Sequence, residues 1–265
     1  MAEIKAYSQA AGTGKYDKAT GLLGKYDNVR RFWEDQLTGI FLRPILNDLV
    51  DEKSRHLERM RILDLGCGSG DGYDLIMNVN REEPGIYDYI TSTITPDLLK
   101  EYVGLDINDD LLAQAQAHYG ASGKMRFARA DFSDGLPFLH DQEPPFDIYM
   151  SSYGTMSHFT NEQLVKMIVD VCRHAPERAL FIGDWLGRYS YEWQDLWHHP
   201  AGTEYFMDYR ISYIYPEEER EKADITSFPL RLMTREEIMQ VIEQAADEAG
   251  VEIRPITFFD RSVLV

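Results

Sequence analysis

The sequence predicts an α/β fold, a Rossmann-like and mostly parallel sheet with helices on both faces. One observation and one general rule support this prediction. Short apolar runs of strand length alternate with stretches of helical periodicity over most of the chain. Strands joined by helices run parallel, and ligands then bind at the carboxyl ends of the strands. We expect seven strands, the last of them antiparallel.

The chain begins with a polar, glycine-containing segment over 1–28, which we expect to be a mobile arm. Apolar residues then recur at three- to five-residue steps, which predicts a helix over 28–57. Pro44 lies inside this helix and should bend or divide it.

The later elements follow from apolar runs, capping residues and helical periodicity. The expected strands are 61–65, 102–107, 125–128, 146–151, 179–182, 251–258 and 262–265. The expected helices are 72–79, 109–119, 161–174 and 235–249. Asn108 can cap the second of these helices, and two capping boxes, Thr160 with Gln163 and Thr234 with Glu237, open the last two.

Two stretches interrupt the alternation of strands and helices. Residues 80–101 form a loop-rich insertion, and residues 186–231 are rich in aromatic side chains. We expect the second insertion to be a lid. The predicted layout is an N-terminal arm and helix (1–58), a cofactor-binding core (59–185), the aromatic-rich lid (186–231) and a core closure of one helix and two strands (232–265).

Composition argues against several classes of protein. The net charge is −18, with 45 acidic and 27 basic residues, so we expect no nucleic-acid partner, because such partners need a basic surface. No apolar run is long enough to span a bilayer, and the first residues lack the apolar core of a signal peptide. We therefore expect a cytoplasmic protein with no membrane partner. No cysteine–histidine cluster has zinc-site spacing, so we expect no metal, and Cys67 and Cys172 are not expected to form a disulfide.

The central motif is Asp64-Leu65-Gly66-Cys67-Gly68-Ser69-Gly70, where a buried strand turns sharply into a helix. Glycines leave no Cβ between backbone and ligand, and the next helix offers unpaired N–H groups. A dinucleotide fingerprint needs a third glycine at 71 or 73, where the chain has Asp71 and Tyr73. A purely structural glycine turn is the other alternative.

Asp64-x-Gly66-x-Gly68-x-Gly70 resembles the first motif of class I S-adenosylmethionine-dependent methyltransferases. The resemblance covers 60–185, with 232–265 as the closure of the sheet. It implies S-adenosylmethionine as the cofactor and S-adenosylhomocysteine as the product. One departure is the distance from Gly66 to Asp106, which is forty residues instead of about twenty; the 80–101 insertion accounts for the excess.

The resemblance implies a role for each cofactor-site residue. Asp106 would accept hydrogen bonds from both ribose hydroxyls, as an ionised carboxylate suits a vicinal diol. Ile107 would pack on the adenine, while Asp131 and Phe132 would meet its edge and face. The other residues that we expect to contact the cofactor are Asp64, Gly66, Cys67, Gly68, Ser151 and, on the arm, Tyr26, with Tyr16 or Arg30 as alternatives. The carboxyl-end loops should all face one crevice.

The acceptor side is less defined. The exit of the fourth strand, 151–159, lacks the Asn/Asp-Pro-Pro-aromatic motif of many nucleic-acid and protein amide N-methyltransferases. His158 and Tyr153 are the candidate catalytic residues, although a histidine here often only braces the loop. Tyr153, Trp185, Tyr189 and Tyr209 are the candidate substrate-pocket residues. The insertion's aromatics either enclose a flat or cationic acceptor or form a small core of their own.

The sequence therefore predicts a methyltransferase that acts on an O or N atom of a small metabolite. The alternatives are a protein or RNA methyltransferase and a non-catalytic subunit that binds S-adenosylmethionine. A homodimer is an open option.

Overall fold

A five-stranded parallel sheet forms the centre of the computed structural model, which describes residues 2–14, 28–81, 91–140, 142–198, 204–211, 218, 221 and 226–261. The strand order is β5-β4-β1-β6-β7. The strands are β1 (Met60–Leu65), β4 (Leu99–Asp106), β5 (Met125–Arg129), β6 (Ile148–Ser151) and β7 (Leu180–Gly183). This confirms the predicted α/β fold with a mostly parallel sheet.

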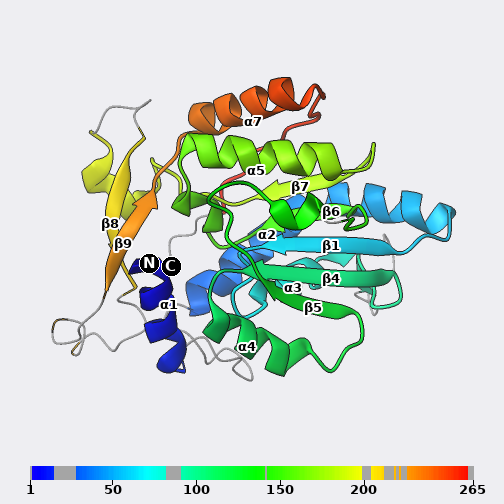
Figure 1. Cartoon of the computed structure of the whole chain (residues 1–265), viewed down its shortest axis with the longest axis horizontal. Coiled ribbons are helices and arrows are strands. Elements are labelled where there is room, and N and C mark those ends of the chain that lie inside the picture. The colour runs from blue at the N-terminus through cyan, green and yellow to red at the C-terminus, as the bar shows by residue number, and fades with distance from the viewer. Residues whose placement is uncertain are drawn as a thin grey trace.

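Helices cover both faces of the sheet (Figure 1). On one face, α2 (Asn28–Arg55) and α3 (Asp71–Met77) share a core with Ile62 of β1. On the other face, α5 (Asn161–His174) and α7 (Arg235–Ala249) share a core with Leu63. Successive strand residues point to opposite faces, so a strand buried on both sides is apolar almost throughout.

The predicted helix starts are confirmed. Helix α4 (Asp109–Tyr119) begins at Asn108, whose side chain accepts hydrogen bonds from two backbone N–H groups of the first turn. Both capping boxes are present, Thr160 with Gln163 at α5 and Thr234 with Glu237 at α7. These signals are local in sequence, which explains why the helix bounds could be predicted.

The mobile arm expected over 1–28 is wrong for its first part, because Ala2–Gly12 forms helix α1. Ala6 and Ala10 of this helix are buried in a small third core. The sequence signal was weak because the buried face consists of small alanines one helical turn apart instead of large apolar residues. Residues 15–27 lie outside the described residues.

The third core joins α1 to an antiparallel pair of strands, β8 (Phe206–Arg210) and β9 (Ser227–Arg231). Figure 1 shows α1 and this pair together at one end of the sheet. Phe228 and Leu230 of β9 are almost fully buried there. The insertion of 186–231 thus has a core of its own, one of the two options that the sequence left open.

Helix α2 continues from Asn28 to Arg55 through Pro44, so of the two expected effects of the proline, a bend or a division, the division is wrong. A proline removes the hydrogen bond to the carbonyl four residues earlier, here that of Ile40. Both Ile40 and Pro44 are exposed, so water can satisfy that carbonyl without interrupting the helix.

The strand expected over 251–258 is also wrong, because residues 251–261 are described without any strand. Pro255 cannot donate a ladder hydrogen bond, and proline is for that reason confined to edge strands, strand starts and bulges. The segment still packs on the core through Ile253, Ile256 and Phe258. The last predicted strand, 262–265, lies outside the described residues, so five strands of the expected seven are confirmed in the main sheet.

The insertion of 80–101 is shorter than expected, because β4 begins at Leu99. Two short strands, β2 (Asn80–Arg81) and β3 (Thr91–Ser92), pair at its base, and residues 82–90 between them lie outside the described residues. Short 3-10 helices complete the fold: η1 (Pro137–His140), η2 (Thr155–His158) and η3 (Tyr191–Leu196). In the described part of the chain, no helix is long and apolar enough to cross a membrane.

Candidate functional site

A cavity of about 1960 Å³ opens at the carboxyl end of the parallel strands. Its wall includes residues from the loops that follow all five strands of the main sheet. Most of the predicted site residues lie on this wall: Gly66, Cys67, Gly68, Asp106, Ile107, Asp131, Phe132, Ser151, Tyr153, His158, Trp185, Tyr189 and Tyr209. Two do not. Asp64 is absent from the wall, and Tyr26 lies outside the described residues.

Gly66 and Gly68 make the sharp turn after β1, and both have positive φ, +75° and +52°. A Cβ on Gly66 would lie 2.2 Å from Cγ2 of Thr155, so the turn after β6 approaches the glycine loop too closely for any side chain there. At Gly68 the nearest atom to such a Cβ is 3.9 Å away, on Leu111. Gly68 therefore presents bare backbone to the cavity.

Asp106, at the end of β4, is held in place by backbone. One carboxylate oxygen accepts the N–H of Gly68 at 2.8 Å, and the other accepts the N–H of Asn108 at 2.8 Å. Burial raises the pKa of Asp106, although these N–H groups oppose that rise. Each oxygen has a further lone pair, so the fixed carboxylate can accept two more hydrogen bonds. This arrangement suits a vicinal diol.

Asp64 is fully buried beneath the glycine loop. Its Oδ2 accepts a hydrogen bond from the hydroxyl of Tyr102 at 2.5 Å, and a Cβ on Gly72 would lie 2.3 Å from this oxygen. The Oδ1 atom has no hydrogen-bond partner among the described residues. Burial raises the pKa of Asp64 to about 7, although the hydrogen bond from Tyr102 opposes that rise. In this position Asp64 lies against the start of α3, and contact with a cofactor stays a prediction.

The remaining predicted cofactor residues surround Asp106 and the glycine loop. Asp131 is exposed and accepts the N–H of Ser133 at 2.9 Å, whereas Phe132 beside it is buried. Ser151 donates to the carbonyl of Leu65 at 2.9 Å and so ties β6 to β1. Burial raises the pKa of Cys67 well above its usual range, so this side chain remains a neutral thiol.

Tyr153 is the centre of a charged cluster that the sequence did not reveal. Its hydroxyl donates to Asp35 at 3.1 Å, and the guanidinium of Arg31 lies over its ring, 4.1 Å from the centroid. Arg31 in turn pairs with Asp71, at the start of α3, at 2.9 Å. Burial works against the charge of Arg31, but Tyr153 and the two carboxylates more than offset it and raise its pKa.

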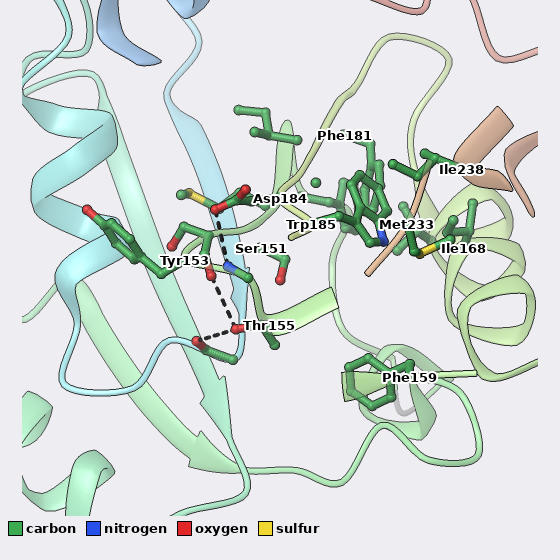
Figure 2. Close-up of a pocket in the computed structure, with 18 of the residues that line it drawn as sticks. Ser151, Tyr153, Thr155, Phe159, Ile168, Phe181, Asp184, Trp185, Met233 and Ile238 are labelled. Atoms are coloured by element: carbon green, nitrogen blue, oxygen red, sulfur yellow. Dashed lines mark hydrogen bonds between the residues drawn. The ribbon is translucent and has the colours of Figure 1, made fainter. Parts of the chain in front are cut away.

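The backbone at Tyr153 has a positive φ of +56°, which is uncommon for a residue with a side chain. The next residue, Gly154, also has a positive φ, and its N–H donates to Asp184 at 3.1 Å (Figure 2). Burial raises the pKa of Tyr153 far above its usual value, so the phenol is neutral at physiological pH. The turn thus aims a protonated phenol into the charged cluster.

The second candidate catalytic residue, His158, contacts the N-terminal helix. Its Nε2 lies 3.2 Å from the hydroxyl of Tyr7, and its ring stacks on Phe228 with a centroid distance of 5.6 Å. These contacts link η2 to α1 and β9. They are the contacts of a side chain that braces the loop, which was one of the two predicted alternatives.

Trp185, Tyr189 and Tyr209 sit in different surroundings. The indole of Trp185 folds back over Gly183, and a Cβ on that glycine would lie 2.3 Å from the ring. Figure 2 shows Trp185 on the same side of the cavity as Met233. Tyr189 is 55% exposed. Tyr209 packs edge-on against Phe228 and so belongs to the third core as well as to the cavity wall.

The wall of the cavity fits a ribose-bearing cofactor. It combines the fixed carboxylate of Asp106, the bare backbone of Gly68 and the hydroxyl of Ser69. The Oγ atom of Ser69 is buried and has no hydrogen-bond partner in the described part of the chain. Among the described residues, no group of three or more His, Cys, Asp or Glu side chains could hold a metal ion.

Comparison with protein families gives one match, a methyltransferase domain over residues 89–176. The matched region runs from before β4 to the end of α5 and includes Asp106, Asp131 and the turn after β6. This match confirms the resemblance to methyltransferases, and S-adenosylmethionine is the cofactor that the resemblance implies. No curated protein sequence matches the chain.

Several solved structures are similar to the chain. DesVI of Streptomyces venezuelae is 14% identical with a TM-score of 0.44, and the match covers 79% of this chain and 83% of that one. A methyltransferase from Methanosarcina mazei is 16% identical with a TM-score of 0.47, covering 71% and 79%. The glycopeptide N-methyltransferase MtfA, complexed with sinefungin, is 14% identical with a TM-score of 0.47, covering 76% and 75%. These likenesses are too distant to indicate a substrate.

Proposed function

We propose that this chain transfers a methyl group from S-adenosylmethionine to an O or N atom of a small metabolite. The observation that supports this most strongly is the pairing of Asp106 with the N–H of Gly68. It joins the glycine loop to the acid at the end of the next strand, forty residues after Gly66, on the wall of one cavity. The methyltransferase-domain match over 89–176 supports the same proposal.

The residues on the wall would divide the work of binding. Asp106 would accept hydrogen bonds from the ribose hydroxyls, while Ile107 and Phe132 would contact the adenine and Asp131 its amino group. Gly68 and Ser69 would lie along the backbone-facing side of the cofactor. When bound, S-adenosylmethionine supplies a methyl group that is activated by its sulfonium. The protein then has to align the acceptor atom and exclude water.

Neither candidate catalytic residue is arranged as an obvious base. Tyr153 is a neutral phenol that donates to Asp35, because burial raises its pKa. His158 is hydrogen-bonded to Tyr7. We therefore propose that both orient the acceptor side of the cavity, and that alignment contributes more to the rate than proton removal by either side chain.

The proposed layout assigns the core to 59–185, its closure to 232–265 and a lid to 186–231. The lid proposal is supported by Tyr189 and Tyr209, which lie on the cavity wall, and by the pair β8–β9, which stands beside α1. A small acceptor agrees with the net charge of −18, which disfavours a nucleic-acid substrate, and a cytoplasmic location belongs to the same proposal.

Isothermal titration with S-adenosylmethionine tests the cofactor part of the proposal. Asp106→Ala should weaken binding at least tenfold, because the variant loses both carboxylate acceptors. Asp134→Asn is the matched control, since this side chain is 87% exposed, and it should bind like the parent chain. Binding of a nicotinamide dinucleotide in place of S-adenosylmethionine would contradict the proposal.

Turnover needs a separate assay. Release of S-adenosylhomocysteine in the presence of a panel of small amines, alcohols and phenols would support a methyltransferase with a small acceptor. Cofactor binding with no release for any acceptor class would favour a non-catalytic subunit.

A further inference from the structure

Two guanidinium groups lie over the aromatic ring of Tyr153. Arg31, in α2, has its guanidinium carbon 4.1 Å from the ring centroid. Arg261, in the segment after α7, has its own at 5.5 Å. Both distances are within the range of cation–π attraction. Tyr153 therefore offers an aromatic surface to cations from two parts of the chain that are far apart in sequence.

Arg261 occupies a slot between two carboxylates. Its Nη1 lies 3.1 Å from Oε2 of Glu34 in α2, and its Nη2 lies 2.8 Å from Oδ2 of Asp184 after β7. The three side chains are only 22%, 14% and 23% exposed. We call this place, formed by Glu34, Tyr153 and Asp184, the cation slot.

The cation slot belongs to the cavity already described, since its three residues and Arg261 all lie on the same wall as Gly66 and Asp106. It also stands on the acceptor side, because Tyr153 follows β6 and Asp184 follows β7. Asp184 accepts the N–H of Gly154 as well, so its carboxylate is fixed by the same turn that places the ring of Tyr153.

The charges around Tyr153 require a cation in the slot. Two further carboxylates, Asp35 and Asp71, form ion pairs with Arg31. Burial works against the charge of Arg261, yet Asp184 and Glu34 more than offset this and raise its pKa. With Arg261 withdrawn, the partly buried carboxylates of Glu34 and Asp184 would lose the cation that lies between them, which is costly unless another cation enters.

Arg261 is more easily displaced than Arg31. Arg31 belongs to α2, whereas Arg261 ends the described segment 251–261, which has neither helix nor strand. Phe259, two residues before Arg261, stacks on Phe41 of α2 with a centroid distance of 4.7 Å, so side-chain packing holds the segment against that helix. Segments without regular hydrogen bonding open at lower free-energy cost than the core of a domain.

We propose that the cation slot is a subsite for a small-molecule acceptor that carries an alkylammonium or guanidinium group, and that Arg261 fills it as an internal stand-in until the acceptor displaces it. This inference rests on the proposed function, because it names the class of acceptor for the same cavity. An aromatic face with two partly buried carboxylates is a combination that recognises organic cations. The segment 251–261 would then open and close with acceptor binding.

Methylguanidine is the probe that tests the slot, measured by isothermal titration without cofactor. The parent chain should bind it weakly, because Arg261 competes. Arg261→Gln should bind at least tenfold more tightly with one site per chain. Adding Asp184→Asn to that variant should remove the gain. Arg254→Gln is the matched control, since Arg254 belongs to the same segment and is 79% exposed, and it should behave like the parent.

A second measurement uses the unaltered protein, so a variant that fails to fold does not end the test. Saturating methylguanidine should increase amide hydrogen exchange over 256–261 and leave β1 and β4 unchanged. A folded Arg261→Gln that binds methylguanidine no better than the parent would overturn the proposal, as would unchanged exchange over 256–261 at saturation.

Titration of the same proteins with S-adenosylmethionine separates this proposal from the proposed function. If S-adenosylmethionine binds and Arg261→Gln shows no gain for methylguanidine, the cation slot is refuted and the cofactor site stands. If the gain for methylguanidine is seen and S-adenosylmethionine does not bind, the slot stands and the proposed function is refuted.

Discussion

The two halves of the cavity are built by different means. The cofactor half, around Gly68 and Asp106, is held by backbone N–H groups, and Asp106 bonds to Asn108 only two residues away. The acceptor half, around Tyr153, is held by charged side chains. Tyr153 meets Asp35 across 118 residues, and Arg261 meets Glu34 across 227. The cofactor half is formed by the ends of two adjacent strands, β1 and β4. The acceptor half forms only when segments that are far apart in the sequence come together.

This difference predicts different responses to perturbation. In the cofactor half, the free energy of unfolding should depend on added side-chain volume and on the protonation of the buried acid Asp64. In the acceptor half, which is built from ion pairs, the free energy of unfolding should depend on salt concentration. The following changes test that contrast, beginning with the largest expected effect.

Asp64→Asn should change the pH dependence of stability. The native chain keeps a proton on Asp64 up to a pKa of about 7, while an unfolded aspartate loses it near 3.9. Between these values the native state binds more protons, so rising pH removes stability, by up to about 4 kcal/mol for this group. Urea unfolding from pH 4.5 to 7.5 should show the parent losing this stability relative to Asp64→Asn. A constant difference between the two proteins would contradict burial as the cause.

Gly66→Ala should destabilise the chain by about 3 kcal/mol, because the new Cβ meets Thr155 and the residue must keep a positive φ. Urea unfolding measures the effect. Gly123→Ala is the matched control, since nothing lies within 4 Å of its Cβ position. Equal effects of the two substitutions would show that the contact with Thr155 does not constrain the glycine loop.

Arg31→Gln should cost about 2 kcal/mol, because it removes the cation that pairs with Asp71 and Asp35 in a partly buried site. Part of this cost should disappear in 1 M NaCl, since screening weakens the repulsion that remains. Unfolding at 0.05 M and 1 M NaCl measures both values. The deficit caused by Gly66→Ala should be the same at both salt concentrations, and a salt-independent deficit for Arg31→Gln would remove the contrast between the halves.

Tyr7→Phe should have the smallest effect, about 1 kcal/mol, because it removes one hydrogen bond to His158. The loss should be local to α1, with amide exchange several times faster over residues 2–12 and unchanged in β1. Uniformly faster exchange over the whole chain would instead place Tyr7 in the global core.

The contrast also explains how much could be predicted from the sequence. The helix starts at Asn108, Thr160 and Thr234 depend on neighbours a few residues away, and the glycine loop and Asp106 are marked by their place at the end of a strand, so these patterns are visible in one sequence. The strand at 251–258 was wrong because its apolar residues pack on the core without ladder bonding.

The acceptor half could not be predicted in the same way. Asp184 carries one local signal, its position at the end of a strand. Arg31 and Arg261 carry none, because an arginine in a polar stretch is normally solvated and only the folded chain shows which carboxylates it meets. Helix α1 was missed because its buried face consists of alanines.

The central claim is that the cavity holds S-adenosylmethionine with its ribose on Asp106. A crystal structure of the complex with S-adenosylhomocysteine tests this directly. The account predicts both ribose hydroxyls within about 3 Å of the Asp106 carboxylate oxygens and the nucleoside lying along Gly68. A ribose bound elsewhere, with Asp106 still bonded only to Gly68 and Asn108, would contradict it.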